Sequence, residues 1–176
     1  TFMFLPFVRS FDVWRFRFYE EGGRTDDVAR IFRIFMAGIA VVALALATYG
    51  ADLFILLADE RFENAAALLP ILNAAVMVQC CYSVTSSAFY VSGETMMWLR
   101  ILASGVVVQI VGSIVLVQAI GLYGAAVSML GANLVIYLIA ARYAPRYWDV
   151  PYPHAQILGL IGIVSVLSYL RTFWPR

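Results

Sequence analysis

The sequence has few charged residues, and what it lacks excludes most classes of soluble protein. Only 13% of its residues are Asp, Glu, Lys or Arg, against about 25% in soluble proteins. All twelve basic residues are arginines, and the net charge is only +1. With 63% hydrophobic residues, the composition excludes an ordinary soluble domain, and the absence of a basic surplus gives no support for nucleic acid as a partner.

Residues that bind metals or catalyse reactions are scarce as well. Cys80 and Cys81 are neighbours in an apolar run, which predicts small packing residues rather than a metal site or a long-range disulfide. His154, the single histidine, lies in a segment rich in proline and tyrosine, which predicts a solvated side chain. The sequence contains no Ser/His/Asp set, no paired catalytic acids and no glycine-rich phosphate loop. We therefore expect no cofactor and no enzymatic activity.

Long apolar stretches are what the sequence does contain. A helix needs about 20 mostly apolar residues to cross a bilayer, and these stretches lack the strict alternation of membrane strands. We therefore expect an all-α fold, a polytopic transmembrane helix bundle that forms a single membrane domain. The expected spans are 34–57, 65–90, 99–120, 122–141 and 156–174.

The opening residues predict an interface with the cytoplasm. Residues 1–8 are almost wholly apolar, and we interpret them as the end of a preceding span in a longer protein. Residues 9–33 combine aromatic residues with arginines, as is typical of the membrane–water interface. In this connector Thr25 can cap a helix. With the connector in the cytoplasm, nine of the twelve arginines fall on that side, as the positive-inside rule requires.

Helical periodicity predicts two packing faces. The apolar residues of the connector recur at helical spacing and share one face; they are Val28, Ile31, Phe32 and Phe35. Small residues recur in 122–141 and at its entry, where they allow two helices to approach closely. These small residues are Gly121, Gly124, Ala125, Ser128, Gly131 and Ala132.

Polar residues inside the spans are the candidate site residues. Gln79, Ser83, Ser86 and Tyr90 are spaced to share one helical face of the second span, and Gln109 lies in the third. Two interpretations stay open: hydrogen bonds between helices, or the polar wall of a substrate cavity facing a sugar-like cargo.

Charged residues near the spans have two interpretations each. Asp52 lies inside an apolar stretch, where ionisable groups are costly and often functional, so it is a candidate for ion coupling unless it simply reaches water. Arg30, Arg33 and Arg100 lie at the same level on the cytoplasmic side. They are candidates for binding a diphosphate head group through charge-assisted hydrogen bonds, or they set the topology.

The order of several short motifs resembles a known family. The segment from Trp14 to Glu21 is similar to the cytoplasmic connector of the polysaccharide (oligosaccharidyl-lipid) flippases, and Leu69-Pro70-Ile71-Leu72 is similar to the start of one of their helices. Further similar steps are Gly121-Leu122-Tyr123-Gly124-Ala125-Ala126, Arg142-Tyr143-Ala144-Pro145 and Val150-Pro151-Tyr152. The resemblance is to the C-terminal part of these proteins, which belong to the multidrug/oligosaccharidyl-lipid/polysaccharide exporter superfamily.

This resemblance implies a function and partners. It implies a lobe of a two-lobe flippase that moves undecaprenyl-diphosphate-linked oligosaccharide across the bacterial inner membrane by alternating access, for O-antigen, capsule or exopolysaccharide synthesis. The implied partners are the lipid-linked oligosaccharide, membrane lipid, other polysaccharide-assembly proteins and the N-terminal lobe of the same chain. Three alternatives remain: a drug or small-molecule exporter of the same superfamily, a membrane enzyme of polysaccharide assembly, and a structural membrane subunit.

Overall fold

The described part of the chain consists of helices. The computed structural model describes the backbone of residues 25–57 and 67–173, with side chains for 25–50 and 67–170. The helices are α2 (Thr25–Leu57), α4 (Leu69–Thr85), α5 (Ser87–Val91), α6 (Thr95–Ile120), α7 (Leu122–Tyr143), the short 3₁₀ helix η2 (Ala144–Arg146) and α8 (His154–Phe173). No strand occurs within these ranges, so the expected all-α fold is confirmed for them.

The described ranges contain four helical stretches long and apolar enough to cross a membrane, which indicates a multi-pass membrane protein. They are Thr25–Gly50, Leu69–Val91, Thr95–Ile120 and Leu122–Arg146. The stretch His154–Leu170 of α8 is apolar but shorter, so the expected fifth span stays a prediction. The expected end of a preceding span at 1–8 and residues 9–24 of the connector lie outside the described residues.

The described part of the connector is helical. From Thr25 onward it runs without a break into the first span, because both lie in α2. Its apolar face packs inward as expected, with Val28 and Phe32 buried. The expected span 65–90 corresponds to the single apolar stretch Leu69–Val91, in which Ser86 separates α4 from α5 while keeping α-helical dihedrals of φ −63° and ψ −14°. The physical reason is a local change in backbone hydrogen bonding, described below.

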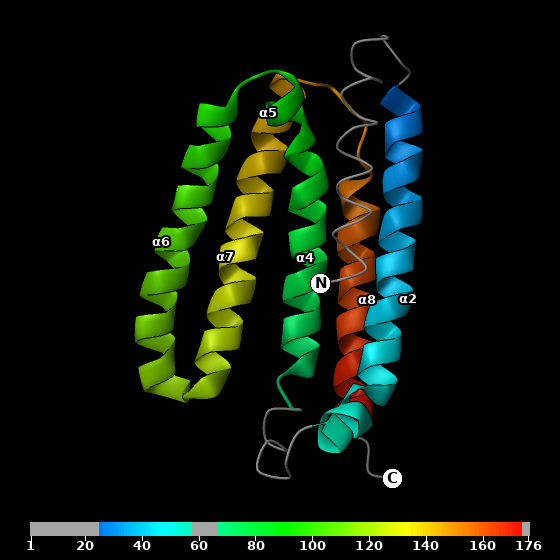
Figure 1. Ribbon diagram of the computed structural model, residues 1–176, viewed down its shortest axis with the longest axis vertical. Coiled ribbons are helices and arrows are strands. Elements are labelled where there is room, and N and C mark those ends of the chain that lie inside the picture. Colours follow the sequence, from blue (N-terminus) through cyan, green and yellow to red (C-terminus); the bar gives the residue numbers. More distant parts are fainter. Residues whose placement is uncertain (1–24, 58–66, 174–176) are drawn as a thin grey trace.

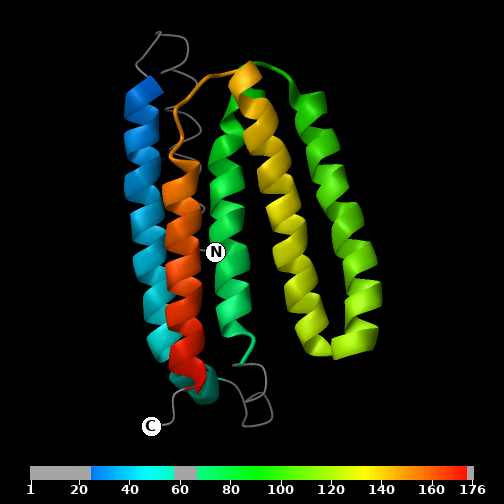
Figure 2. The same ribbon diagram turned by 180° about the vertical axis from the view of Figure 1, so that it is seen from behind.

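The helices form a row with α4 at its centre. Helix α6 packs on α7, α7 packs on α4, and α4 also contacts α2 and α8, which pack on each other (Figures 1 and 2). Burial follows this order, because 61% of the apolar window in α4 and α5 is buried, against 11% of the window in α6. Most of α4 and α5 therefore lies within the bundle, whereas much of α6 faces outward.

Small residues allow α6 and α7 to approach closely. Gly121 forms the turn between them with φ of +62°, a conformation that favours glycine. A Cβ atom at Gly124 would collide with the backbone of Leu116, and one at Gly112 would lie 3.0 Å from Cβ of Ser128. The expected packing role therefore holds for Gly124 and Ser128 but not for Gly131, which faces open space.

The arginines whose side chains the structure describes gather at one end of the bundle, which we call the arginine end. Helices α2 and α6 begin there, and α7 ends there (Figure 1). The arginines of these segments are Arg30, Arg33, Arg100, Arg142 and Arg146. The segment that follows η2 packs against the bundle at this end, with Trp148, Val150 and Tyr152 buried.

Candidate functional site

The expected polar stripe lies on the central helix of the row and continues into α5. Gln79 and Ser83 are half-buried on α4, and Tyr90 on α5 is 37% exposed. Ser86 differs, because it is 2% exposed at the break between the two helices. The stripe is therefore interrupted: its partly open members are Gln79 and Ser83 on one side of the break and Tyr90 on the other.

The hydroxyl groups of the stripe bond to their own helix. Ser83 Oγ donates to the carbonyl of Gln79 at 2.9 Å, and Ser86 Oγ donates to the carbonyl of Ser83 at 2.7 Å. Because each proton goes to the backbone, the oxygen atoms keep lone pairs that can accept further hydrogen bonds. These two bonds do not link α4 to another helix. The interpretation as interhelical hydrogen bonds therefore gains no support from Ser83 and Ser86.

Gln109 takes part in the interface between α6 and α7. Its Nε2 donates to Ser113 Oγ and to Ser128 Oγ, both at 3.2 Å, and the two serine oxygens are 2.9 Å apart. Ser128 Oγ in turn donates to the carbonyl of Ala125 at 2.9 Å. Within the described residues, this network fits the interpretation of Gln109 as an interhelical hydrogen-bonding residue better than that of a cavity wall.

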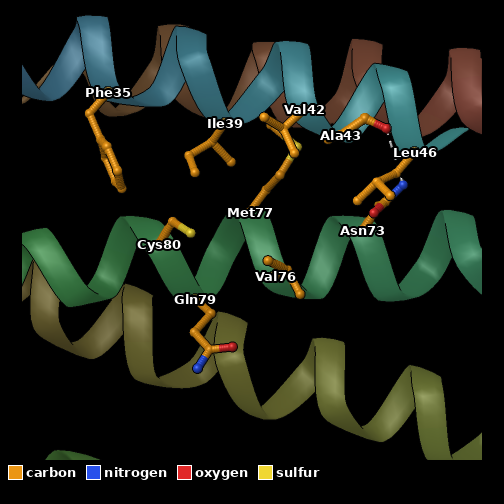
Figure 3. Close-up of a pocket in the computed structure, with 10 residues that line it drawn as sticks. All are labelled: Phe35, Ile39, Val42, Ala43, Leu46, Asn73, Val76, Met77, Gln79 and Cys80. Atoms are coloured by element: carbon orange, nitrogen blue, oxygen red, sulfur yellow. Dashed lines mark hydrogen bonds between the residues drawn. The ribbon is translucent and has the colours of Figure 1, made fainter. Parts of the chain in front are cut away.

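A groove of about 360 Å³ lies between α2 and α4. Figure 3 shows side chains between the two helices, with Met77 of α4 reaching toward α2, whereas the amide of Gln79 points away from α2. The residues that line it are Phe35, Ile39, Val42, Ala43, Leu46, Asn73, Val76, Met77, Gln79 and Cys80. Asn73 and Gln79 are the two amides in an otherwise apolar lining, and Gln79 belongs to both the groove and the polar stripe.

Two asparagines hold α4 to its neighbours, and sequence reasoning gave neither a role. Asn73 Nδ2 donates to the carbonyl of Ala43 on α2 at 3.3 Å. Asn133 Nδ2 donates to the carbonyl of Ala75 from α7 at 3.0 Å, and Asn133 is 8% exposed. An amide inside an apolar run was the available signal, but the sequence does not show which helix the amide faces.

The head-group candidates lie at one end but on two sides of the row. Arg30 and Arg33 are exposed on α2, and Arg100 is exposed on α6. Helices α7 and α4 lie between α2 and α6 (Figure 2). The structure therefore does not bring the three guanidinium groups into one site. The side chain of Asp52, the candidate for ion coupling, lies outside the described residues, and its role stays a prediction.

His154 is not the solvated residue that its loop context predicted. It is half-buried, and its Nδ1 lies 2.7 Å from the hydroxyl oxygen of Tyr137. The expectation failed because composition describes the loop but not the helix that packs beside it. Burial lowers the pKa of His154 below its ordinary value of 6.5, since a charged imidazolium is disfavoured where water is excluded.

The cysteines are buried and free, as their apolar context predicted. Cys80 is 3% exposed, and Cys81 is fully buried with its Sγ 3.7 Å from Sδ of Met36. No group of three or more His, Cys, Asp or Glu side chains that could hold a metal ion occurs in the described ranges.

No protein-family model, curated protein or solved structure matches this chain. The functional interpretation rests on the residues themselves: a central helix with a partly open polar face, an apolar groove that shares Gln79 with this face, and a helix break beside Ser83.

Proposed function

We propose that this chain is part of a flippase that moves lipid-linked oligosaccharide from the inner to the outer leaflet of the bacterial inner membrane. The cargo would serve surface polysaccharide synthesis, and no covalent bond would be made or broken. The partners in this proposal are the lipid-linked oligosaccharide, membrane lipid and other polysaccharide-assembly proteins. The motif order from Trp14 to Tyr152 supports the family, and the polar face of α4 supports transport of a polar cargo.

The partly open polar face of the central helix is the observation that carries the proposal. Gln79 and Ser83 lie well inside the stretch Leu69–Val91, yet the packing of α2, α7 and α8 around α4 leaves both partly exposed. Polar groups left facing lipid are costly, so this face is expected to line a water-filled path or to contact a polar cargo. A sugar carries many hydroxyl groups, which can donate to the serine oxygen and pair with the amide.

The helix break beside this face is a second supporting observation. Transporters place substrate sites at discontinuous transmembrane helices, because polar backbone and side-chain groups become available there without leaving the membrane. Here the break at Ser86 falls between Ser83 and Tyr90, within the stripe. A cargo that moves along the stripe would therefore pass the break.

Reconstitution of the full-length protein into proteoliposomes tests the proposal. A fluorescent undecaprenyl-diphosphate-linked oligosaccharide is supplied, its exposure to an external quencher is followed, and the lipid is recovered for mass analysis. Protein-dependent exposure with unchanged mass is the expected result. A changed mass would instead identify a membrane enzyme, and neither exposure nor a changed mass, with several sugars tried and folding confirmed, would reject the flippase.

Substitutions of Gln79 and Ser83 test whether these residues line the cavity. The double variant Gln79→Leu/Ser83→Ala should slow exposure roughly tenfold, because it removes two hydrogen-bonding groups worth about 0.5–1.5 kcal/mol each. Gln118→Leu/Ser165→Ala is the matched control, since Gln118 is exposed on α6 and Ser165 Oγ bonds within α8. If both double variants slowed exposure equally, or if Gln79→Leu/Ser83→Ala did not slow it, Gln79 and Ser83 would not line the cavity. The flippase assay itself would still be valid.

The apolar groove favours a second candidate, a small-molecule exporter of the same superfamily. Its volume of about 360 Å³ falls within the range of about 300–1,000 Å³ typical of small-molecule sites, and its lining is mainly apolar. An exporter would move a hydrophobic fluorescent dye across the same proteoliposomes. Val42→Trp would fill the groove and block the dye but leave the stripe intact, because Val42 lines the groove from α2.

A further inference from the structure

The backbone changes its hydrogen-bonding pattern where α4 ends. The N–H of Ser86 still donates to the carbonyl of Tyr82 at 2.8 Å, four residues earlier. Past this point the N–H of Phe89 donates to the carbonyl of Ser86 at 3.0 Å, three residues earlier, while the bond from Tyr90 to the same carbonyl lengthens to 3.4 Å. The change is confined to one turn, because Ser86 keeps α-helical dihedrals and α5 is itself α-helical. A turn that tightens toward 3₁₀ geometry in mid-helix often marks a hinge.

The side chains around the break favour bending. Ser83, Thr85 and Ser86 each donate a hydroxyl proton to a carbonyl of the preceding turn, at 2.7–2.9 Å. Bonds of this kind compete with the helical ladder and bend helices. Ser165 makes the same bond in α8, which has no break, so one such hydroxyl alone is not sufficient. At the break three of them occur within four residues.

The residues just past the break are tied to a different part of the bundle. The ring of Phe89 on α5 stacks on Trp98 of α6 with centroids 6.0 Å apart and lies 5.5 Å from the ring of Tyr147. Figure 1 shows α5 at the end of the bundle where α6 begins and α7 ends. Helix α5 is therefore held by the first turn of α6 and by the segment after η2.

The side chains at the break are small and so present little steric resistance to a rotation of α5 relative to α4. Thr85, Ser87 and Ala88 are fully buried, and Ser86 is 2% exposed, yet all four side chains are small. On the α4 side, Tyr82 contacts Trp98 with ring centroids 6.0 Å apart. A swing of α5 with the first turn of α6 would thus keep the contact of Phe89 with Trp98. It would change two aromatic contacts, between Tyr82 and Trp98 and between Phe89 and Tyr147.

We propose that Ser86 is a hinge at which α5, together with the first turn of α6, swings relative to α4. The swing moves Tyr90 relative to Ser83 and so opens or closes the arginine end of the polar stripe. This inference goes beyond the proposed function, because it concerns a motion of the helices and does not depend on which cargo crosses the membrane.

Distance measurements between spin labels test the hinge in the full-length protein in lipid nanodiscs without cargo. Labels are attached at Val76→Cys on α4 and Met96→Cys on α6, which are 46% and 63% exposed, in a background where Cys80 and Cys81 are alanine. The parent should give a broad or two-peaked distribution. Ser86→Ala should narrow it and Ser86→Gly should broaden it, whereas Ser165→Ala, the matched control, should leave it unchanged.

Backbone amide hydrogen exchange provides a second test, which can first be made on the parent protein. The backbone amides of residues 87–89 should exchange roughly tenfold faster than those of residues 77–81, because a hinge opens locally without global unfolding. Ser86→Ala should reduce this difference. Slow exchange at 87–89 equal to that of α4, or one narrow distance distribution shared by the parent and both Ser86 variants, would overturn the hinge. A flippase assay that fails would overturn the proposed function but not this result.

Discussion

The hydroxyl oxygen of Tyr137 lies 2.7 Å from Nδ1 of His154 and joins α7 to the first residue of α8. Both helices pack on α4, and they make few contacts with each other. Tyr137 is 1% exposed, and its ring centroid lies 5.7 Å from that of His154. The bond is therefore a direct side-chain connection between two helices that the rest of the packing joins mainly through a third.

Loss of the Tyr137 hydroxyl should destabilise the fold by about 1 kcal/mol, the typical net worth of one hydrogen bond. Tyr137→Phe keeps the ring and removes only this bond to His154. Unfolding can be followed with a thiol-reactive fluorophore, because Cys80 and Cys81 are buried and react only when the bundle opens. Tyr123→Phe is the matched control, since Tyr123 is 42% exposed on the same helix; equal effects of the two would contradict the prediction.

Acid should destabilise the bundle through His154. Burial lowers the pKa of His154 in the folded state below 6.5, so the unfolded chain takes up a proton at a higher pH than the folded chain does. The contribution of neutral His154 to stability is therefore present above about pH 6.5, is lost as the pH falls below it, and levels off below the folded-state pKa. The rings of Tyr137 and Tyr152 flank the imidazole, with centroids 5.7 and 5.8 Å from it.

The unfolding temperature at neutral and mildly acidic pH measures this effect. His154→Gln keeps a polar side chain but cannot take up a proton, so its unfolding temperature should fall less than that of the parent between the two pH values. An identical fall in both proteins would show that other groups, such as exposed carboxylates, account for the acid sensitivity.

Helix positions could be read from the sequence because hydrophobic length is the main requirement of a membrane span. Helices α6 and α7 lie within a few residues of the expected 99–120 and 122–141. The break at Ser86 could not be read in this way. Serine and threonine interrupt neither the apolar length nor the helical spacing of 65–90, and the break depends on which carbonyl each hydroxyl and amide group bonds.

The candidate site was predictable as a face but not as a set of contacts. Helical spacing placed Gln79 and Ser83 on one side of a helix, and both are half-buried on α4. The same spacing also placed Ser86 on this open face. In the structure Ser86 is buried where α4 meets α5. It also could not show that Gln109 turns toward Ser128, since that contact depends on how two helices pack.

Asn133 should stabilise the contact between α7 and α4 through its bond to the carbonyl of Ala75. Asn133→Leu keeps the size of the side chain and removes this bond of 3.0 Å. We expect a loss of about 0.6–1.7 kcal/mol, the range for polar contacts between membrane helices. The thiol-reactivity assay measures it, with Gln118→Leu as the control, since that amide is exposed on α6. A neutral or stabilising Asn133→Leu would show that the amide is not needed for packing.

Glycine at position 124 should be required for the α6–α7 hairpin, because a Cβ atom there would collide with the backbone of Leu116. Backbone cannot move aside as a flexible side chain can, so Gly124→Ala must push the two helices apart. We expect a cost of about 1–3 kcal/mol, as in other overpacked cores. Gly131→Ala is the matched control on the same helix: no atom lies within 4 Å of the added Cβ, and alanine should gain roughly 0.5–1 kcal/mol of helix propensity. The two variants should therefore shift the unfolding temperature in opposite directions, and a shift of the same sign and size would show that close packing of α6 on α7 does not depend on Gly124.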